Sequence, residues 1–239
     1  MIVTDTFVYI HTSRSAGTFL NKLIMDHVQS ARMIQYHGHL RDLPQQFTHL
    51  PVIGLVRNPW DWYVSMFYDY RRKQQYIYQV LSNRGTLGFA DTVRRFLTLG
   101  DGSEENRRLL QQLCKTAPAA ITRQTPPRRR LPGLRSEHFA SYPPDRGYYS
   151  WLFELMYSTD RDHAIHIGHF ENLRSEVVRL FEETKTPISN EISTYLEETR
   201  ALNASPRPPN RTAGYTPELA ELVREKDRTL IDKWGYSFD

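Results

Sequence analysis

The sequence predicts an α/β fold with a parallel sheet, and three observations support this prediction. Strand-like and helical segments alternate along the N-terminal third of the chain. Residues 51–56 (PVIGLV) are almost wholly apolar, as expected of a parallel strand covered on both faces. The 239 residues are 39% hydrophobic and 24% charged, which suits a soluble protein with one well-buried domain, here taken as residues 1–239.

The first strand–loop–helix segment lies near the N-terminus. Phe7–Ile10 is expected to form a short buried strand, and a polar turn at residues 11–17 (HTSRSAG) follows it. Apolar residues then recur at helical spacing over Thr18–Val28, which predicts a helix. A second strand is expected at Ala31–Tyr36, directly before His37-Gly38-His39.

The third strand, residues 51–56, is followed by a clear helix start. Asn58 is a good N-cap residue, and Pro59 stands at the first helical position, where proline is favoured. The helix is predicted to run to about Arg72.

The later elements are expected to be mainly helical. One more strand is predicted at His163–Gly168, and residues 115–147, rich in Pro and Arg, are expected to be an irregular region on the acceptor side. Residues Arg94–Cys114 are expected to be mostly helical, and helices are predicted at Tyr148–Tyr157, Leu173–Thr184 and Pro217–Trp234, the last with Thr216 as cap and Gly235 as stop.

Composition narrows the classes of function. Cys114 is the single cysteine, which excludes a disulfide framework and a zinc site built on several thiolates. His163, His166 and His169 alternate along a strand but lack paired carboxylates, so no metal is expected. No run of about 18 apolar residues and no signal peptide is visible, so we expect no membrane span and a cytoplasmic location. The net charge of +4 suits an anionic ligand without requiring nucleic acid.

Ligands of open α/β sheets bind beyond the carboxyl ends of the strands, which directs attention to the turn at residues 11–17. Gly17 lets the backbone approach an oxyanion, and the amides at the helix start are donors. Ser13, Ser15 and Thr18 add hydroxyls, and Arg14 adds a fixed positive charge. Taken alone, the turn is equally compatible with a polar connection that binds nothing.

Arg57 directly follows the buried third strand, where a charge is costly unless it is paired. Ser65 lies about two helical turns further on, so Arg57 and Ser65 together can hold a phosphate in addition to an oxyanion bound at the turn of residues 11–17. The alternative is a structural salt bridge from Arg57 to Asp61 or Asp69.

Together, these stretches resemble a known family. HTSRSAGTFL resembles the 5′-phosphosulfate loop of sulfotransferases, which commonly reads H-x-P-K-T-x-G-T. VRNPWDWYVSMFYDYR resembles their 3′-phosphate motif, R-[ND]-P-x-[DE]-x-x-[VL]-S-x-[YF], and YHGHLRDL resembles the segment of uronyl 2-O-sulfotransferases that carries the base histidine. The C-terminal NRTAGYTPELAELVREKDRTLIDKWGYSF is similar to the tail of bacterial and carbohydrate sulfotransferases. The resemblance covers roughly residues 6–72 and 163–238.

The resemblance implies a three-layer sandwich with a central, mostly parallel sheet, the P-loop NTPase-like sulfotransferase fold. It implies 3′-phosphoadenosine 5′-phosphosulfate (PAPS) as the donor, adenosine 3′,5′-bisphosphate as the product and no metal. The acceptor is expected to be a hydroxyl-bearing small molecule or an anionic saccharide, not nucleic acid. The implied cofactor-binding residues are Arg14, Ser15, Ala16, Gly17, Thr18 and Phe19 for the 5′-phosphosulfate, Arg57 and Ser65 for the 3′-phosphate, and Arg211.

The same resemblance implies catalytic roles for His39, His37 and Arg14. His39 matches the family base most closely, and His37 is the second choice. Arg14 stands at the family's lysine and Ser13 at its proline. Arginine can stabilise charge on the leaving group but is effectively never deprotonated.

Other functions are compatible with parts of the sequence. A P-loop kinase is disfavoured because the first loop lacks Gly-Lys-Ser/Thr and the third strand ends in Arg57, not in a magnesium-binding Asp. A non-catalytic binder of nucleotide or nucleic acid is supported weakly by the basic run at Arg128-Arg129-Arg130. This run is either a solvated loop or a lid over an anionic acceptor. Trp60 and Trp62 are expected in the core or in the acceptor wall.

Overall fold

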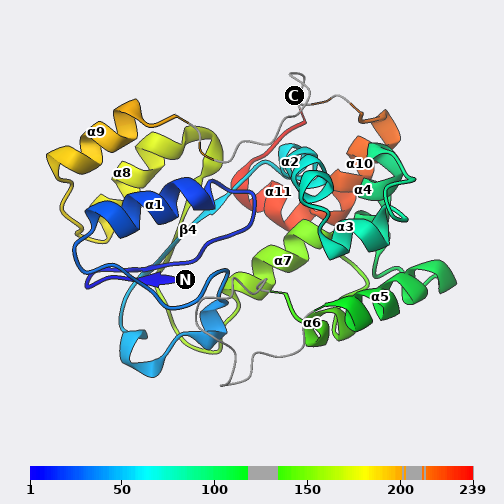
Figure 1. The fold of residues 1–239 in the computed structure, drawn as a ribbon, viewed down its shortest axis with the longest axis horizontal. Coiled ribbons are helices and arrows are strands. Elements are labelled where there is room, and N and C mark those ends of the chain that lie inside the picture. The colour runs from blue at the N-terminus through cyan, green and yellow to red at the C-terminus, as the bar shows by residue number, and fades with distance from the viewer. Residues whose placement is uncertain (118–133, 201, 203–211, 213, 239) are drawn as a thin grey trace. The chain divides into compact units, whose positions relative to one another are not determined.

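The computed structural model describes residues 1–117, 134–200, 202, 212 and 214–238 (Figure 1). The chain divides into two compact units, each made of two segments. The first unit comprises Met1–Arg57 and Leu155–Ala204, and the second comprises Asn58–Glu154 and Ser205–Asp239. The expectation of one domain over residues 1–239 stays a prediction.

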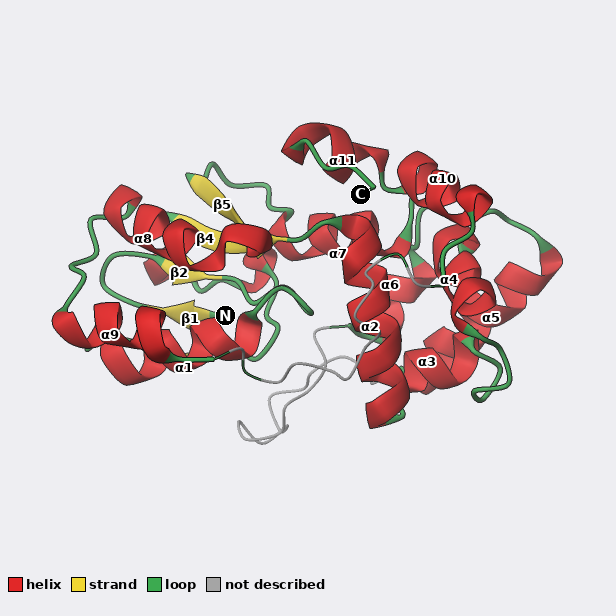
Figure 2. Cartoon of the chain, turned by 90° about the horizontal axis from the view of Figure 1, so that it is seen from above, coloured by secondary structure: helices red, strands yellow, loops and turns green. Residues whose placement is uncertain are grey.

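The first unit contains a five-stranded mixed sheet with the order β3-β1-β2-β4-β5, of which Figure 2 shows β1, β2, β4 and β5 side by side. Its strands are β1 (Ile2–Val3), β2 (Val8–Tyr9), β3 (Arg32–Met33), β4 (Val52–Val56) and β5 (Ile165–His169). The β2–β4 and β4–β5 pairs are parallel, as predicted. β1 pairs antiparallel with both β2 and β3.

The antiparallel β1 makes the sheet mixed rather than wholly parallel. Sequence analysis did not predict this strand, because the two residues Ile2 and Val3 are too few to give a periodic signal. Since β1 runs opposite to both of its neighbours, β3 has the same direction as β2. The carboxyl ends of β2, β3, β4 and β5 therefore share one edge of the sheet.

Three helices of the first unit share one hydrophobic cluster with one face of the sheet. They are α1 (Gly17–His27), α8 (Leu173–Glu183) and α9 (Asn190–Glu198), and three short 3-10 turns accompany them: η1 (Leu40–Asp42), η2 (Gln45–Phe47) and η3 (Phe170–Asn172). Tyr9, Ile53 and Leu55 contribute the strand side of the cluster, in the alternating pattern of a pleated sheet. The predictions of α1 and α8 are confirmed, whereas α9 was not predicted. The three-layer sandwich stays a prediction.

On the opposite face of β4, Gly54 packs against Tyr157. All five residues of β4 are buried, as expected from their apolar run. A Cβ atom on Gly54 would lie 1.7 Å from the Tyr157 hydroxyl oxygen. That hydroxyl is 3.0 Å from the Thr12 hydroxyl and donates to the Ile10 carbonyl at 3.3 Å. Gly54 thus leaves room for a tyrosine that holds the end of β2.

The described residues of the second unit are mainly helical. Its helices are α2 (Pro59–Lys73), α3 (Tyr76–Leu81), α4 (Phe89–Thr98), α5 (Glu104–Thr116), α6 (Ser136–Ala140), most of α7 (Tyr148–Tyr157), α10 (Pro217–Lys226) and α11 (Arg228–Trp234). The start of α2 is as predicted, because the Asn58 side chain accepts hydrogen bonds from the amides of Trp60 and Asp61. Trp62 is fully buried and stacks on Tyr149 with ring centroids 4.4 Å apart, so it belongs to the core.

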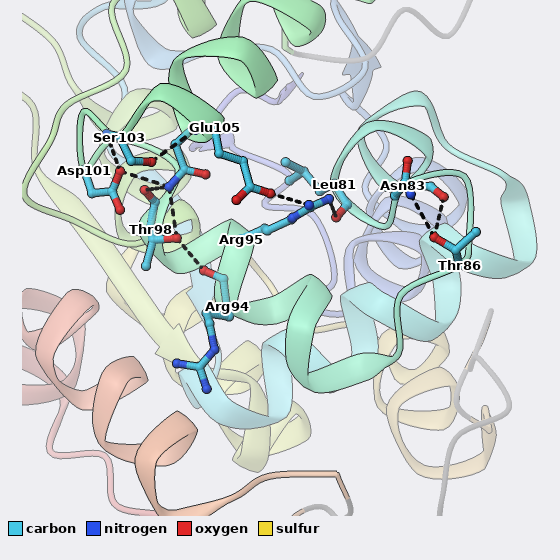
Figure 3. A network of polar contacts seen from close by, with 10 residues as sticks. Leu81, Asn83, Thr86, Arg94, Arg95, Thr98, Asp101, Ser103 and Glu105 are labelled. Carbon is cyan, nitrogen blue, oxygen red and sulfur yellow. Dashed lines mark hydrogen bonds and ion pairs between the residues drawn. The ribbon is translucent and has the colours of Figure 1, made fainter.

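Residues 94–114 are mostly helical, as predicted, but they belong to two helices, because the chain turns between α4 and α5. The side-chain amide Nδ2 of Asn106 donates to the carbonyl and hydroxyl of Thr98 and to the Asp101 carboxylate, at 2.7, 3.2 and 3.0 Å. Figure 3 shows Thr98, Asp101 and Ser103 of this turn. Ser103 caps α5, and its own amide donates to Asp101 at 2.8 Å. Burial opposes ionisation of Asp101, but the hydrogen bonds from Asn106 and Ser103 outweigh it and hold its pKa below the usual value.

The predicted helix over Pro217–Trp234 is also two helices, α10 and α11. Its ends are as predicted, since Thr216 accepts a hydrogen bond from the Leu219 amide and Gly235 adopts a left-handed conformation with φ of 65°. The break falls at Asp227, which is fully buried and accepts a hydrogen bond from the Ser150 amide at 2.8 Å.

The irregular region predicted at residues 115–147 contains the short helix α6, which was not predicted. Residues 118–133, including Arg128-Arg129-Arg130, lie outside the described residues.

Candidate anion-binding site

The loop between β2 and α1 presents the start of a helix at the shared edge of the sheet. Ala16 precedes the helix in a left-handed conformation with φ of 54°, and the Leu20 amide donates to its carbonyl at 3.1 Å. The first amides of α1, from Gly17 onward, have no carbonyl partner within the helix. Such a helix start favours an anion through both its amides and its dipole.

The position of the His11 ring explains why residue 17 is glycine. A Cβ atom at Gly17 would lie 1.7 Å from His11 Nε2, so no larger residue fits without a rearrangement. Asn21, one turn further along α1, donates from its amide to His11 Nδ1 at 3.1 Å. Burial, together with nearby His37 and Arg14, holds the His11 pKa well below its ordinary value. His11 is therefore a neutral residue that shapes the loop.

His37 extends from the end of β3 to the same loop. Its Nδ1 donates to the His11 carbonyl at 3.0 Å, and the two rings have centroids 4.2 Å apart. Because Nδ1 carries the proton in this bond, Nε2 of the neutral ring is the acceptor. His37 is half-buried and has a left-handed backbone with φ of 51°.

His39, the other predicted base, differs from His37 in exposure. It precedes η1 in an extended conformation, and its side chain is only 1% exposed. A general base must come within hydrogen-bonding distance of the acceptor proton. His37, by contrast, is half-buried.

Arg57 joins the end of β4 to the loop. It is 4% exposed, and its Nη1 donates to the Arg14 carbonyl at 2.8 Å. Its guanidinium carbon lies 4.1 Å from the centroid of the Phe170 ring. Asp69, one of the two alternative partners considered above, forms ion pairs with Arg72 and Lys73 at 2.8 and 2.9 Å.

Arg14 and Ser15 occupy the centre of the loop. Arg14 is half-buried and has φ of 64°, a conformation that costs a non-glycine residue roughly 1–2 kcal/mol. Asp26, further along α1, forms an ion pair with Lys22. Ser15 is 1% exposed, and its hydroxyl has no hydrogen-bond partner among the described residues. A buried hydroxyl of this kind suits a ligand oxygen.

The structure thus brings together Arg14, Ser15, Gly17, His37 and Arg57, and places Ala16 and Thr18 beside them in the chain. The Phe19 ring packs against Tyr195, so Phe19 contributes its backbone amide, not its side chain, to the start of α1. Ser65 is buried in α2 of the second unit. Arg211 lies outside the described residues.

Sequence analysis missed two residues of this site, Asn21 and Phe170. Asn21 interrupts the apolar stripe of α1 one turn after Gly17, and a polar residue at a buried position is a usable signal. Phe170 directly follows β5, so its place at the shared edge was predictable once β5 was known to be parallel.

Two features of the described residues bear on other classes of site. Over the described ranges, no group of three or more His, Cys, Asp or Glu side chains is arranged to hold a metal ion. None of the helices in the described part of the chain combines the length and apolar character needed to cross a membrane.

Comparison with known proteins gives no relative: no family model, no curated protein and no solved structure matches the chain. The function is therefore inferred from the sequence and from the geometry of this site.

Proposed function

We propose that the protein is an enzyme, a sulfotransferase that moves a sulfuryl group from PAPS to a hydroxyl of an acceptor. The observation that carries the proposal is the contact between Arg57 and the loop before α1. The buried Arg57 guanidinium, at the end of β4, donates to the Arg14 carbonyl in this loop, and the loop leads into a helix start that suits an anion. A P-loop NTPase-like sulfotransferase fold would use these two elements for the 3′-phosphate and the 5′-phosphosulfate.

The loop has groups that fit a phosphosulfate. The amides at the start of α1 can donate to non-bridging oxygens, and the buried Ser15 hydroxyl offers a further donor. Arg14 adds a fixed positive charge where negative charge grows on the leaving oxygen. Backbone strain at Arg14, Ala16 and His37 supports the same assignment, because left-handed non-glycine residues cluster at functional sites.

The proposed reaction is a direct in-line transfer. When bound, PAPS supplies the activated sulfuryl group. The acceptor oxygen forms a bond to sulfur while the bond from sulfur to the 5′-phosphate oxygen breaks, and that oxygen keeps the electron pair. His37 Nε2 takes the acceptor proton, since Nδ1 is already bonded to the His11 carbonyl. The exposure of His37 supports it as the base ahead of His39.

The acceptor is proposed from the chemistry around the base. The uronyl-type segment YHGHLRDL, which contains His37 and His39, supports a saccharide hydroxyl. The net charge of +4 is compatible with an anionic saccharide.

Calorimetric titration with adenosine 3′,5′-bisphosphate tests the proposal. We expect a dissociation constant well below 1 mM, with adenosine 5′-phosphate binding more weakly because it lacks the 3′-phosphate. Absence of binding at millimolar ligand would exclude a sulfotransferase. Binding without sulfuryl transfer to any tested saccharide would favour a non-catalytic nucleotide-binding protein.

A further inference from the structure

We infer that Arg57 is a positioning residue that holds the phosphosulfate loop in shape and links it to the 3′-phosphate end of the nucleotide. The inference rests on the proposed function for the second of these roles only. A residue that simply contacts a 3′-phosphate needs no bond to the other end of the site. Arg57, however, donates to the Arg14 carbonyl, in the middle of the loop.

The bond acts on a strained part of the backbone. Arg14 and Ala16 both have positive φ, at 64° and 54°, and neither is glycine. Such conformations persist only where the surroundings stabilise them. A charge-assisted bond of 2.8 Å to the Arg14 carbonyl is such a stabilising contact.

Phe170 fixes the guanidinium that makes this bond. The Arg57 guanidinium carbon lies 4.1 Å from the Phe170 ring centroid, and the side chain is 4% exposed. Stacking on an aromatic face leaves the edge of the planar guanidinium available for hydrogen bonds. One guanidinium carries five N–H donors, so a single arginine can bond to more than one group at a time. Binding of the 3′-phosphate should therefore affect the affinity of the loop for the 5′ end of the nucleotide.

Hydrogen exchange of the ligand-free protein tests the first role. The Ser15 amide donates to the Thr12 carbonyl at 3.4 Å within the loop and reports its order. In Arg57→Met we expect exchange of the Ser15 amide to be at least about tenfold faster, the effect of losing one charged hydrogen bond. Phe170→Leu keeps the guanidinium and should accelerate exchange about threefold.

The matched control is Arg179→Met. Arg179 also belongs to the first unit and donates to a backbone carbonyl, that of Ile167, at 3.0 Å, but it makes no contact with the loop. Since the Arg179 partners are Glu176, Glu183 and Ile167, this variant should leave Ser15 exchange unchanged, and β4 amides report any general loss of stability in all three variants. Ser15 exchange that is unchanged in both Arg57→Met and Phe170→Leu would overturn the inference.

A pair of nucleotides tests the link between the two ends. Adenosine 3′,5′-bisphosphate and adenosine 5′-phosphate differ only in the 3′-phosphate. We expect Arg57→Met to lower the affinity for the bisphosphate by about 100-fold or more and the affinity for the monophosphate by about tenfold. Phe170→Leu should weaken both ligands equally, and Arg57→Lys should recover part of the bisphosphate loss through its charge. A monophosphate affinity unaffected by Arg57→Met would reduce Arg57 to a simple phosphate contact. Failure of the wild type to bind the bisphosphate would instead overturn the proposed function, while the exchange result on the loop would stand.

Discussion

Replacing Asp227 with Asn should change how the stability of the second unit depends on pH. Asp227 is fully buried between α10 and α11, and it accepts a hydrogen bond from the Ser150 amide. Burial raises its pKa from 3.8 to about 6, although Ser150 and Tyr63 donate hydrogen bonds that oppose the rise. The folded protein therefore holds this proton at a higher pH than the unfolded chain does.

The sign and size of the effect follow from linkage. A raised pKa means that the protonated carboxyl favours folding, so its contribution is complete below about pH 3.8 and is lost as the pH rises through about 6. At about 1.4 kcal/mol per pH unit, the free energy of unfolding falls by about 3 kcal/mol over this window. An Asn side chain has no such proton to lose. The stability of Asp227→Asn relative to wild type should therefore rise by about 2 kcal/mol between pH 4 and pH 7, because the unfolded carboxyl is already partly ionised at pH 4.

Urea unfolding followed by tryptophan fluorescence measures this difference selectively. All four tryptophans (Trp60, Trp62, Trp151 and Trp234) belong to the second unit, so the signal reports that unit. Asp232→Asn, an exposed change of the same charge in α11, is the control and should leave the pH dependence of wild type in place. A difference between wild type and Asp227→Asn that stays within about 0.5 kcal/mol across this pH range would show that burial does not raise the Asp227 pKa.

Three further predictions concern the candidate site. Arg14→Lys should keep the single-turnover rate at saturating PAPS within about tenfold, whereas Arg14→Met should lower it by roughly 10² to 10³; a Met variant equal to wild type would remove Arg14 from the chemistry. His37→Ala should lower turnover by about 10² with little change in nucleotide affinity, and a folded His39→Ala variant with the larger loss would return the base to His39. Gly17→Ala should destabilise the protein by about 1–3 kcal/mol, because its Cβ meets the His11 ring, and an unchanged thermal midpoint would contradict that fit.

The elements that could be predicted are those with local signals. The helix α2 begins where Asn58 and Pro59 indicate, and the apolar run of residues 51–56 forms the buried parallel strand β4. The turn before α1 was likewise visible from its polar residues and Gly17. In each case the residues that determine the structure lie within a few positions of one another.

The features that were missed depend on distant partners. The break at Asp227 is accompanied by a hydrogen bond to Ser150, which no helical pattern in residues 217–234 could indicate. The proximity of His37 to the loop depends on the direction of β3, which the unrecognised strand β1 determines. The contact from Arg57 to the Arg14 carbonyl was also out of reach, because sequence gives residue types but not the side-chain direction.

The order of the sheet has a consequence for the growing chain. Strands β1, β2 and β3 all lie within the first 33 residues, so their pairing needs only short loops and can form early in synthesis. The apolar β4 pairs with β5, and the whole segment Asn58–Glu154 must be synthesised before β5 emerges. At roughly 5–20 residues per second, this leaves one edge of β4 without its partner for roughly 5–20 s. An apolar strand edge is a site of aggregation, so the nascent chain is most vulnerable during this interval.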